Sequence, residues 1–328
     1  MSAEQRLEQK RQILQEQYDL LAKKLTLLRL DWAVETDTAH RFKLATQIEA
    51  NERELKETET ELGELEQQLT TVKQASSSEK LYSALLKLGY RQQTREFRQF
   101  INAHSAAAFL IYGSPEYGQR WLLNRLIVKD IPSILTGKIV RIDLSRIARR
   151  NDINALWREL GGRVGLGRQS TITEIAERVY QWWMTQNVLL IFYDVDCLSE
   201  TFLHELIRDF WMPLANKVKE ATSPSSQFKL LMFLVDYGGC AGSWNVPFAE
   251  GHNAWKLTKI KEFSEDDLTY WLDFASDKLP SKLTEQVEET IQNILKKSDN
   301  GIPEPALEEI CLLSGCNWYE QEEKWLRL

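Results

Sequence analysis

One segment in the first half of the chain combines a buried-strand signal, a glycine turn and a helix start, and it limits the fold more than any other. Residues 109–120 read Phe-Leu-Ile-Tyr-Gly-Ser-Pro-Glu-Tyr-Gly-Gln-Arg. The glycines at Gly113 and Gly118 have the spacing of a phosphate-binding loop that leads from a strand into a helix. This spacing favours an α/β protein of the P-loop kind.

The two residues after the second glycine depart from that pattern. In G-x-x-x-x-G-K-[ST] the lysine neutralises the nucleotide phosphates and the hydroxyl binds Mg²⁺, whereas Gln119 and Arg120 stand here. The Arg120 guanidinium could pair with phosphate oxygens. Alternatively, Arg120 is a solvated residue and the glycines serve only the turn. We therefore expect a nucleotide-switch scaffold whose nucleotide chemistry is weakened or lost.

The acid that would hold a metal ion is also in doubt. The apolar run 188–192 is followed by Tyr193, Asp194, Val195 and Asp196. If the metal-binding acid directly follows the run, its position is taken by Tyr193, which cannot hold Mg²⁺. If it comes one residue later, the acid is Asp194, and Asp196 supports it or caps a helix. A third apolar strand ends at Asp236, where a basic or polar sensor would help to neutralise phosphate. We expect no catalytic residue, no metal site and no cofactor, with ATP or ADP as a possible weak ligand.

Strand and helix patterns alternate through the middle of the chain, which predicts a parallel sheet covered on both faces. The expected strands are 107–112, 138–143, 188–193, 229–235 and 255–257. The expected helices between them are 119–128, 152–160, 173–185 and 201–218. After Phe263 the pattern changes to short acidic helices, and Ser264 with Asp267 three residues later predicts a helix start.

The first 74 residues have the heptad pattern of a coiled coil. The apolar seam includes Leu14, Leu21, Leu28, Leu55, Leu62 and Leu69, and the polar residues Asn51 and Thr58 interrupt it. The short polar break at 35–38 predicts an antiparallel helical hairpin. We expect this seam to be an interaction site, because a hairpin of this size has little core of its own.

These patterns divide the chain into four parts. We expect a coiled-coil hairpin at 1–74, a linker at 75–79, an α/β module at 80–262 and a helical lid domain at 263–328. The linker assignment depends on the small polar residues Ala75, Ser76, Ser77 and Ser78.

Charge and composition exclude several classes of function. A net charge of −7 for 328 residues argues against a constitutive binder of nucleic acid or anionic membrane, although residues 138–168 hold 8 basic and 3 acidic residues. The four cysteines have no C-x-x-C spacing, so we expect neither a zinc site nor a disulfide framework. The polar start of the chain and the lack of a long apolar run predict a cytoplasmic protein without a membrane segment.

Four segments together resemble the STAND branch of the AAA-like P-loop ATPases. They are 113–120, the strand 189–196, the helix start 263–268 and the turn Gly301-Ile302-Pro303. The missing lysine and hydroxyl make the chain most similar to the inactive STAND-like modules of bacterial conflict and signalling proteins. The resemblance implies a sheet order of 5-1-4-3-2, a role for Pro303 beside the nucleotide site, and an output that lies in a partner protein.

The sequence thus favours a non-catalytic adaptor or scaffold in a bacterial signalling or defence system. Its partner would be a protein bound through the coiled coil, or a second copy. One alternative is a nucleotide-binding switch that uses Arg120, Asp194 and Pro303. Another is a DNA-associated regulator that uses the basic residues of 138–168.

Overall fold

The structure is a computed structural model, and it describes residues 3–148, 153–167, 169–221, 228–248, 251, 253–322 and 324. The chain forms two compact units, Met1–Lys80 and Leu81–Leu328. None of the described helices has the length and apolar composition needed to cross a membrane.

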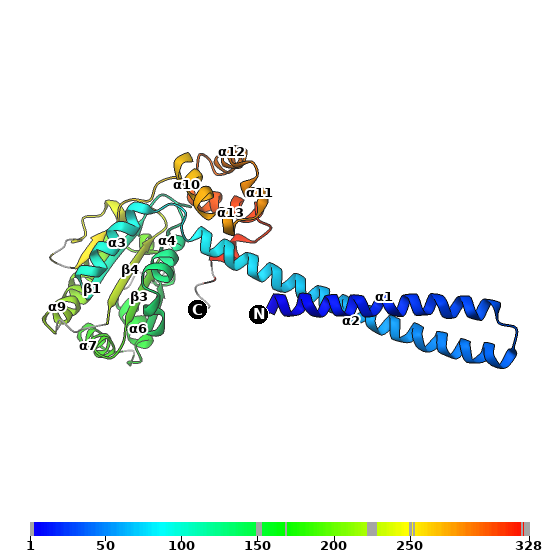
Figure 1. Ribbon diagram of the computed structural model, residues 1–328. Helices are drawn as coiled ribbons and strands as arrows, with labels where there is room; N and C mark the ends of the chain where they lie inside the picture. The colour runs from blue at the N-terminus through cyan, green and yellow to red at the C-terminus, as the bar shows by residue number, and fades with distance from the viewer. Residues whose placement is uncertain are drawn as a thin grey trace. The chain divides into compact units, whose positions relative to one another are not determined.

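The first unit is an antiparallel helical hairpin (Figure 1). Helix α1 (Ala3–Val34) is followed by a three-residue turn and by α2 (Thr38–Leu85). The Asp37 carboxylate accepts hydrogen bonds from the backbone N–H groups of Ala39 and His40 and so caps the start of α2. Two ion pairs join the helices along their length, Arg29 with Glu52 at 2.6 Å and Lys73 with Glu8 at 3.7 Å. The predicted break between two antiparallel helices is confirmed.

The predicted leucine seam lies between α1 and α2 of one chain. Leu21, Leu62 and Leu69 are buried, and Leu14, Leu28 and Leu55 are half-buried. The polar residues Asn51 and Thr58 are buried in the same seam. The seam leucines therefore stabilise the hairpin itself, and an interaction with another molecule would need a different face.

The segment expected to be a linker is helical. Residues 75–79 lie inside α2, which continues to Leu85. No glycine or proline occurs between Gly63 and Gly89, so nothing in the local sequence stops the helix. The segment predicted as a linker is thus a continuous helix, and the boundary between the two compact units falls directly after it, at Lys80.

A five-stranded parallel sheet is the centre of the second unit. Its strands are β1 (Ala106–Tyr112), β2 (Lys138–Asp143), β3 (Val188–Tyr193), β4 (Leu230–Asp236) and β5 (Ala254–Lys256). Their order is β2-β3-β4-β1-β5, which is the predicted order read from the opposite edge. All observed pairings are parallel. The predicted fold class is confirmed.

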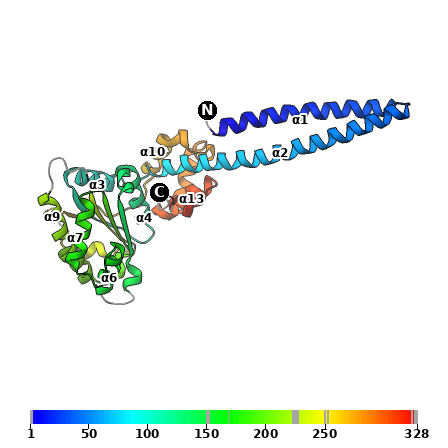
Figure 2. The ribbon, with the colours of Figure 1, turned by 90° about the horizontal axis from the view of Figure 1, so that it is seen from below.

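Helices cover both faces of the sheet (Figure 2). The helices up to β5 are α3 (Arg91–Ala103), α4 (Gln119–Arg125), α5 (Leu144–Ala148), α6 (Ile153–Arg163), α7 (Ile172–Trp183), α8 (Glu200–Glu205) and α9 (Met212–Ala221). Side chains alternate along β1: Ala107, Phe109 and Ile111 share one buried cluster with α3 and α4. Ala108 and Leu110 share the other cluster with α6, α7 and α9. Coverage of both faces explains why the strands are nearly continuous apolar runs.

The helices after Phe263 belong to the same compact unit as the sheet. They are α10 (Glu265–Ala275), α11 (Ser281–Thr284), α12 (Val287–Lys297), α13 (Pro303–Leu313) and α14 (Trp318–Glu322). The predicted start of α10 is confirmed, with a reciprocal cap between Ser264 and Asp267. Trp271 of α10 lies in the cluster that covers the β1 side chains Phe109 and Ile111, so these helices share a core with the sheet.

The Gly301-Ile302-Pro303 turn connects α12 to α13 and contacts the segment that follows β5. Gly301 has a φ of 97°, and a Cβ there would collide with the Phe263 carbonyl. The Phe263 N–H donates to the Gly301 carbonyl at 2.8 Å. Only glycine fits this approach, and Pro303 is then in place to begin α13.

Candidate functional site

The loop between β1 and α4 has the course of a phosphate-binding loop, but its own side chains fill it. Gly118 caps α4 with a φ of 69°. The Gln119 side chain, only 2% exposed, turns back into the loop, where Nε2 donates to the Ser114 carbonyl at 2.9 Å. The residue in the lysine position thus closes the loop on itself. A neutral amide so placed offers no charge to a phosphate.

The loop is also held by residues distant in sequence. The Tyr90 hydroxyl donates to the Tyr117 carbonyl at 3.3 Å, and the Tyr117 hydroxyl donates to Glu262. From the start of α13, the Glu304 N–H donates to the Glu116 carbonyl at 3.0 Å. These bonds fix the loop against the segment before α3 and against the helices that follow the sheet.

Carboxylates gather beside the loop, where Glu304 interacts electrostatically with Glu322 and Glu116. Burial raises the pKa of Glu304, and the neighbouring charges of Glu322 and Glu116 raise it further. Acidic groups so close together disfavour the approach of a phosphate chain, which carries several negative charges. Pro303, expected beside the nucleotide, lies next to Gly118: a Cβ added to that glycine would be 3.6 Å from the Pro303 Cβ.

Arg120, which could have replaced the lysine, is engaged elsewhere. Its Nε donates to the Tyr237 hydroxyl at 2.7 Å. The guanidinium carbon lies 5.0 Å from the Tyr237 ring centre and 5.8 Å from that of Tyr193. Both tyrosines follow or end strands of the sheet, and Arg120 thus bridges α4 and the carboxyl ends of β3 and β4 through cation–π contacts.

The predicted acid Asp194 pairs with another carboxyl group. Asp194 follows β3 with a φ of 56°, and its side chain shares a hydrogen bond with Asp143 at the end of β2. Burial, that hydrogen bond and the Asp143 charge raise the pKa of Asp194 to about 6. The Asp143 charge therefore makes ionisation of Asp194 less favourable.

The remaining predicted acids organise turns. Asp196 accepts a hydrogen bond from the Tyr237 N–H at 3.0 Å. Asp236 is fully buried and accepts bonds from the N–H groups of Gly239 at 2.7 Å and Ala241 at 2.8 Å. Both shape the loop that follows β4. Within the described residues, no group of three or more His, Cys, Asp or Glu side chains could hold a metal ion.

Several residues at this edge were not singled out from the sequence. They are Tyr90, Glu116, Asp143, Tyr237, Glu304 and Glu322. Asp143 and Tyr237 could have been found, because the carboxyl ends of adjacent parallel strands meet at one edge. Tyr90 and Glu304 come from segments far along the chain, and no local pattern marks them.

The basic residues of 138–168 do not form a free positive face in the part that the structure describes. Arg146 pairs with Asp143 at 3.0 Å and Arg163 with Glu159 at 2.8 Å. Arg141 and Arg158 also have partners. Arg149, Arg150 and Arg168 lie outside the described residues.

Comparison with known families agrees with this geometry. Residues 85–235 match the model of a family described as inactive STAND. This part of the chain is similar to that family. The predicted resemblance is therefore confirmed. In this chain the position of the phosphate-binding lysine holds Gln119, whose side chain fills the loop.

A solved structure and the curated proteins were also compared with the chain. The structure of the Aeropyrum pernix ORC1 protein in complex with DNA matches with a TM-score of 0.41 and 11% identity. The match covers 73% of this chain and 65% of that protein's chain, so this chain spans somewhat less than two thirds of it. No curated protein matches.

Proposed function

We propose that this chain is a non-catalytic adaptor, in which the hairpin assembles copies and the STAND module is a recognition body. The observation that carries the proposal is the closed loop: Gln119 fills it, and Glu304 lies beside it. A loop in this state has lost the lysine and the hydroxyl on which phosphoryl transfer depends. The setting implied by the family resemblance is a bacterial signalling or defence system in the cytoplasm.

A second apolar stripe on α1 supports an assembly role for the hairpin. Ile13, Leu20, Leu27 and Val34 recur every seven residues and are 58%, 68%, 63% and 79% exposed. Leu30, which is 61% exposed, lies between the last two. A seven-residue apolar repeat on the surface of a helix is suited to packing against a further helix. We therefore assign self-association to this outer stripe.

The test is a pair of double variants of the full chain. Leu20→Glu with Leu27→Glu places charge on the outer stripe, whereas Thr60→Glu with Gln67→Glu adds the same charge to exposed positions of α2 with the same spacing. Light scattering measures the mass of each. We expect the wild type and the α2 variant to associate, and the α1 variant to be a monomer.

Two results would contradict the proposal. A wild-type protein that is still monomeric at about 100 µM would contradict self-association. Its dissociation constant would then exceed that concentration, and the free energy of association would be weaker than about −5.5 kcal/mol. Calorimetric binding of Mg-ATP tighter than that same concentration would favour the nucleotide switch instead. Neither measurement depends on the other.

A further inference from the structure

Two exposed aromatic rings on α10 lie under two cations. Tyr270 and Phe274 are 56% and 55% exposed, and their rings stack with centres 6.1 Å apart and planes 5° apart. The Arg91 guanidinium carbon is 4.2 Å from the centre of the Tyr270 ring, and the Lys87 ammonium is 4.4 Å from that of Phe274. We call these four residues the cation–aromatic surface.

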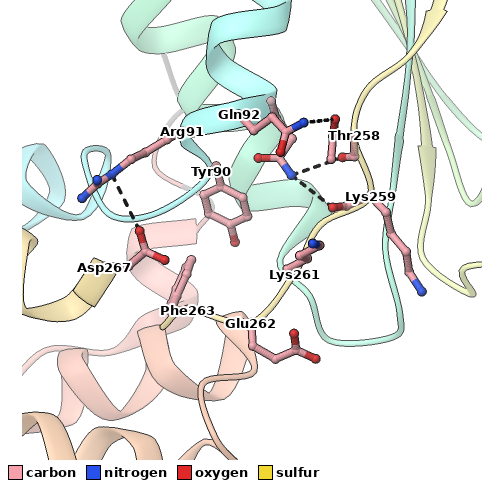
Figure 3. Close-up of a pocket in the computed structure, with 10 residues that line it drawn as sticks. Tyr90, Arg91, Gln92, Thr258, Lys259, Lys261, Glu262, Phe263 and Asp267 are labelled. Atoms are coloured by element: carbon pink, nitrogen blue, oxygen red, sulfur yellow. Dashed lines mark hydrogen bonds and ion pairs between the residues drawn. The ribbon is translucent and has the colours of Figure 1, made fainter. Parts of the chain in front are cut away.

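A small pocket continues this surface beyond Arg91 (Figure 3). Its volume is about 180 Å³, and Tyr90 and Phe263 form an aromatic wall. Lys259 and Lys261 come to the pocket from the segment after β5, and both are exposed. Arg91 pairs with Asp267 at 3.7 Å across the pocket's edge, so the pocket and the cation–aromatic surface share a residue.

Positive charge accumulates beside the same surface. Burial together with the charges of Arg125 and Lys87 lowers the pKa of Lys129 to about 8. Burial and like charges depress the pKa of an ammonium group in this way, and here they outweigh the opposing charge of Asp130. An anion bound here would be attracted by Lys87 and Lys129 together.

The carboxylates near these cations already have partners. Asp267 caps α10 and pairs with Arg91, Glu262 accepts from Tyr117, and Asp130 accepts from Arg98. Among the described residues, Lys87, Lys129, Lys259 and Lys261 form no ion pair. Of these four cations, Lys87 lies over Phe274, and Lys259 and Lys261 line the adjoining pocket.

We propose that the cation–aromatic surface and its pocket bind an acidic peptide segment of a partner protein. The carboxylates of the segment would pair with Lys87, Lys259 and Lys261, and an apolar side chain between them would pack on Tyr270 and Phe274. Aromatic and arginine side chains with a charged surround are typical of interface hot spots. This surface lies in the second unit, Leu81–Leu328, and is independent of the outer stripe of α1.

A peptide fits the charge pattern better than a nucleic acid. The first turn of α10 carries Glu265, Asp266 and Asp267, next to the aromatic rings. A continuous phosphate backbone would meet these carboxylates, and the net charge of −7 would repel it further. A peptide can place its few carboxylates opposite the lysines alone.

The experiment selects peptides from a random displayed library on the immobilised full chain and measures the enriched sequences by fluorescence anisotropy. We expect the enriched peptides to be acidic with at least one aromatic or aliphatic residue. Lys259→Glu with Lys261→Glu, and Tyr270→Ala with Phe274→Ala, should each weaken binding by about tenfold or more. The matched control, Lys219→Glu with Lys282→Glu, reverses two exposed lysines elsewhere and should leave binding unchanged.

Three outcomes would overturn the proposal. One is the absence of any acidic enrichment. Another is peptide binding that both test variants leave intact although their thermal unfolding matches that of the wild type. The last is tight binding of labelled oligo(dT) that the same variants abolish, because this would assign the surface to nucleic acid. Association of the chain through α1 is measured separately, so failure here leaves the hairpin proposal standing.

Discussion

The Tyr90 hydroxyl occupies the space in which a side chain at Gly118 would begin. A Cβ added to Gly118 would overlap the Tyr90 oxygen, and that oxygen is hydrogen-bonded to the Tyr117 carbonyl at 3.3 Å. Burial raises the pKa of Tyr90 well above its usual range, so the hydroxyl stays protonated and remains a donor. In a phosphate-binding loop this glycine would approach a phosphate, whereas here it approaches a tyrosine.

Gly118→Ala should therefore destabilise the protein strongly. The backbone at Gly118 has a φ of 69°, and the added methyl group would displace Tyr90. We expect a loss of about 2–3 kcal/mol from strain and overpacking together. Denaturant unfolding measures it. Gly162→Ala is the matched control, because that glycine is in α6 with nothing near its Cβ position. It should gain about 0.5–1 kcal/mol, and equal effects of the two changes would contradict the prediction.

Restoring the lysine and hydroxyl should not restore nucleotide binding. In Gln119→Lys with Arg120→Thr, the bonds to the Ser114 carbonyl and the Tyr237 hydroxyl are lost, which we expect to cost about 1–3 kcal/mol of stability. Glu304 still lies beside the loop. Calorimetry with Mg-ATP should show no binding with a Kd of about 100 µM or tighter, which corresponds to a binding free energy of about −5.5 kcal/mol.

Adding Glu304→Gln to that variant separates the two obstacles. If the triple variant binds ATP, the carboxylate was the main barrier. ATP binding by the double variant without Glu304→Gln would contradict our account, because it would mean that the chain lacked only the lysine and the hydroxyl for nucleotide binding.

Asp194→Asn should change the pH dependence of stability. The folded-state pKa of Asp194 is raised to about 6, so the folded protein binds more protons than the unfolded chain between about pH 4 and 6, and stability falls as pH rises through this range. Asparagine removes the charge. We expect the variant to match the wild type near pH 4 and to be about 1 kcal/mol more stable near pH 7, a figure reduced because the side chain is partly exposed.

As a control, Asp143→Asn should change the stability at neutral pH in the opposite direction. The hydrogen bond from Ser145 lowers the pKa of Asp143, so its carboxylate stabilises the fold above the unfolded-state pKa, and this contribution disappears as pH falls. The Asp143 variant should be less stable than the wild type at neutral pH, and the difference should shrink in acid. Equal pH slopes for the two variants would refute the assigned protonation states.

Local pattern predicted the strands and the helix start at Ser264 because each depends on neighbouring residues alone. It did not predict that the Gln119 side chain turns back to the Ser114 carbonyl, since the sequence pattern gives no side-chain direction. Tyr90 and Glu304, which also hold the loop, come from other elements. The two stripes of α1 were difficult to separate for another reason. Leu14, Leu21 and Leu28 repeat every seven residues, and so do Ile13, Leu20 and Leu27, one position earlier; only the packed structure shows which set is buried.

The seam of the hairpin offers the last prediction. Asn51 is 6% exposed, and its Nδ2 donates to the Gln47 carbonyl at 2.9 Å. Among the residues that the structure describes, its Oδ1 has no hydrogen-bond partner. An unsatisfied buried oxygen costs about 1–3 kcal/mol, so Asn51→Leu should raise the stability of the hairpin by about 1–2 kcal/mol. Circular dichroism of the full chain during heating measures this.

Asn51→Leu should also make the register and the partner number of the hairpin helices less specific. A buried asparagine restricts register and partner number because other arrangements leave it unpaired in apolar surroundings. We expect light scattering of Asn51→Leu to show a broader range of masses than the wild type. Thr58→Val is the control: the Thr58 hydroxyl already donates to the Glu54 carbonyl at 2.9 Å, so stability should change by less than about 1 kcal/mol. A less stable hairpin in Asn51→Leu would show that the asparagine makes a favourable contact in the assembled protein, and a single unchanged mass would show that it does not set the pairing.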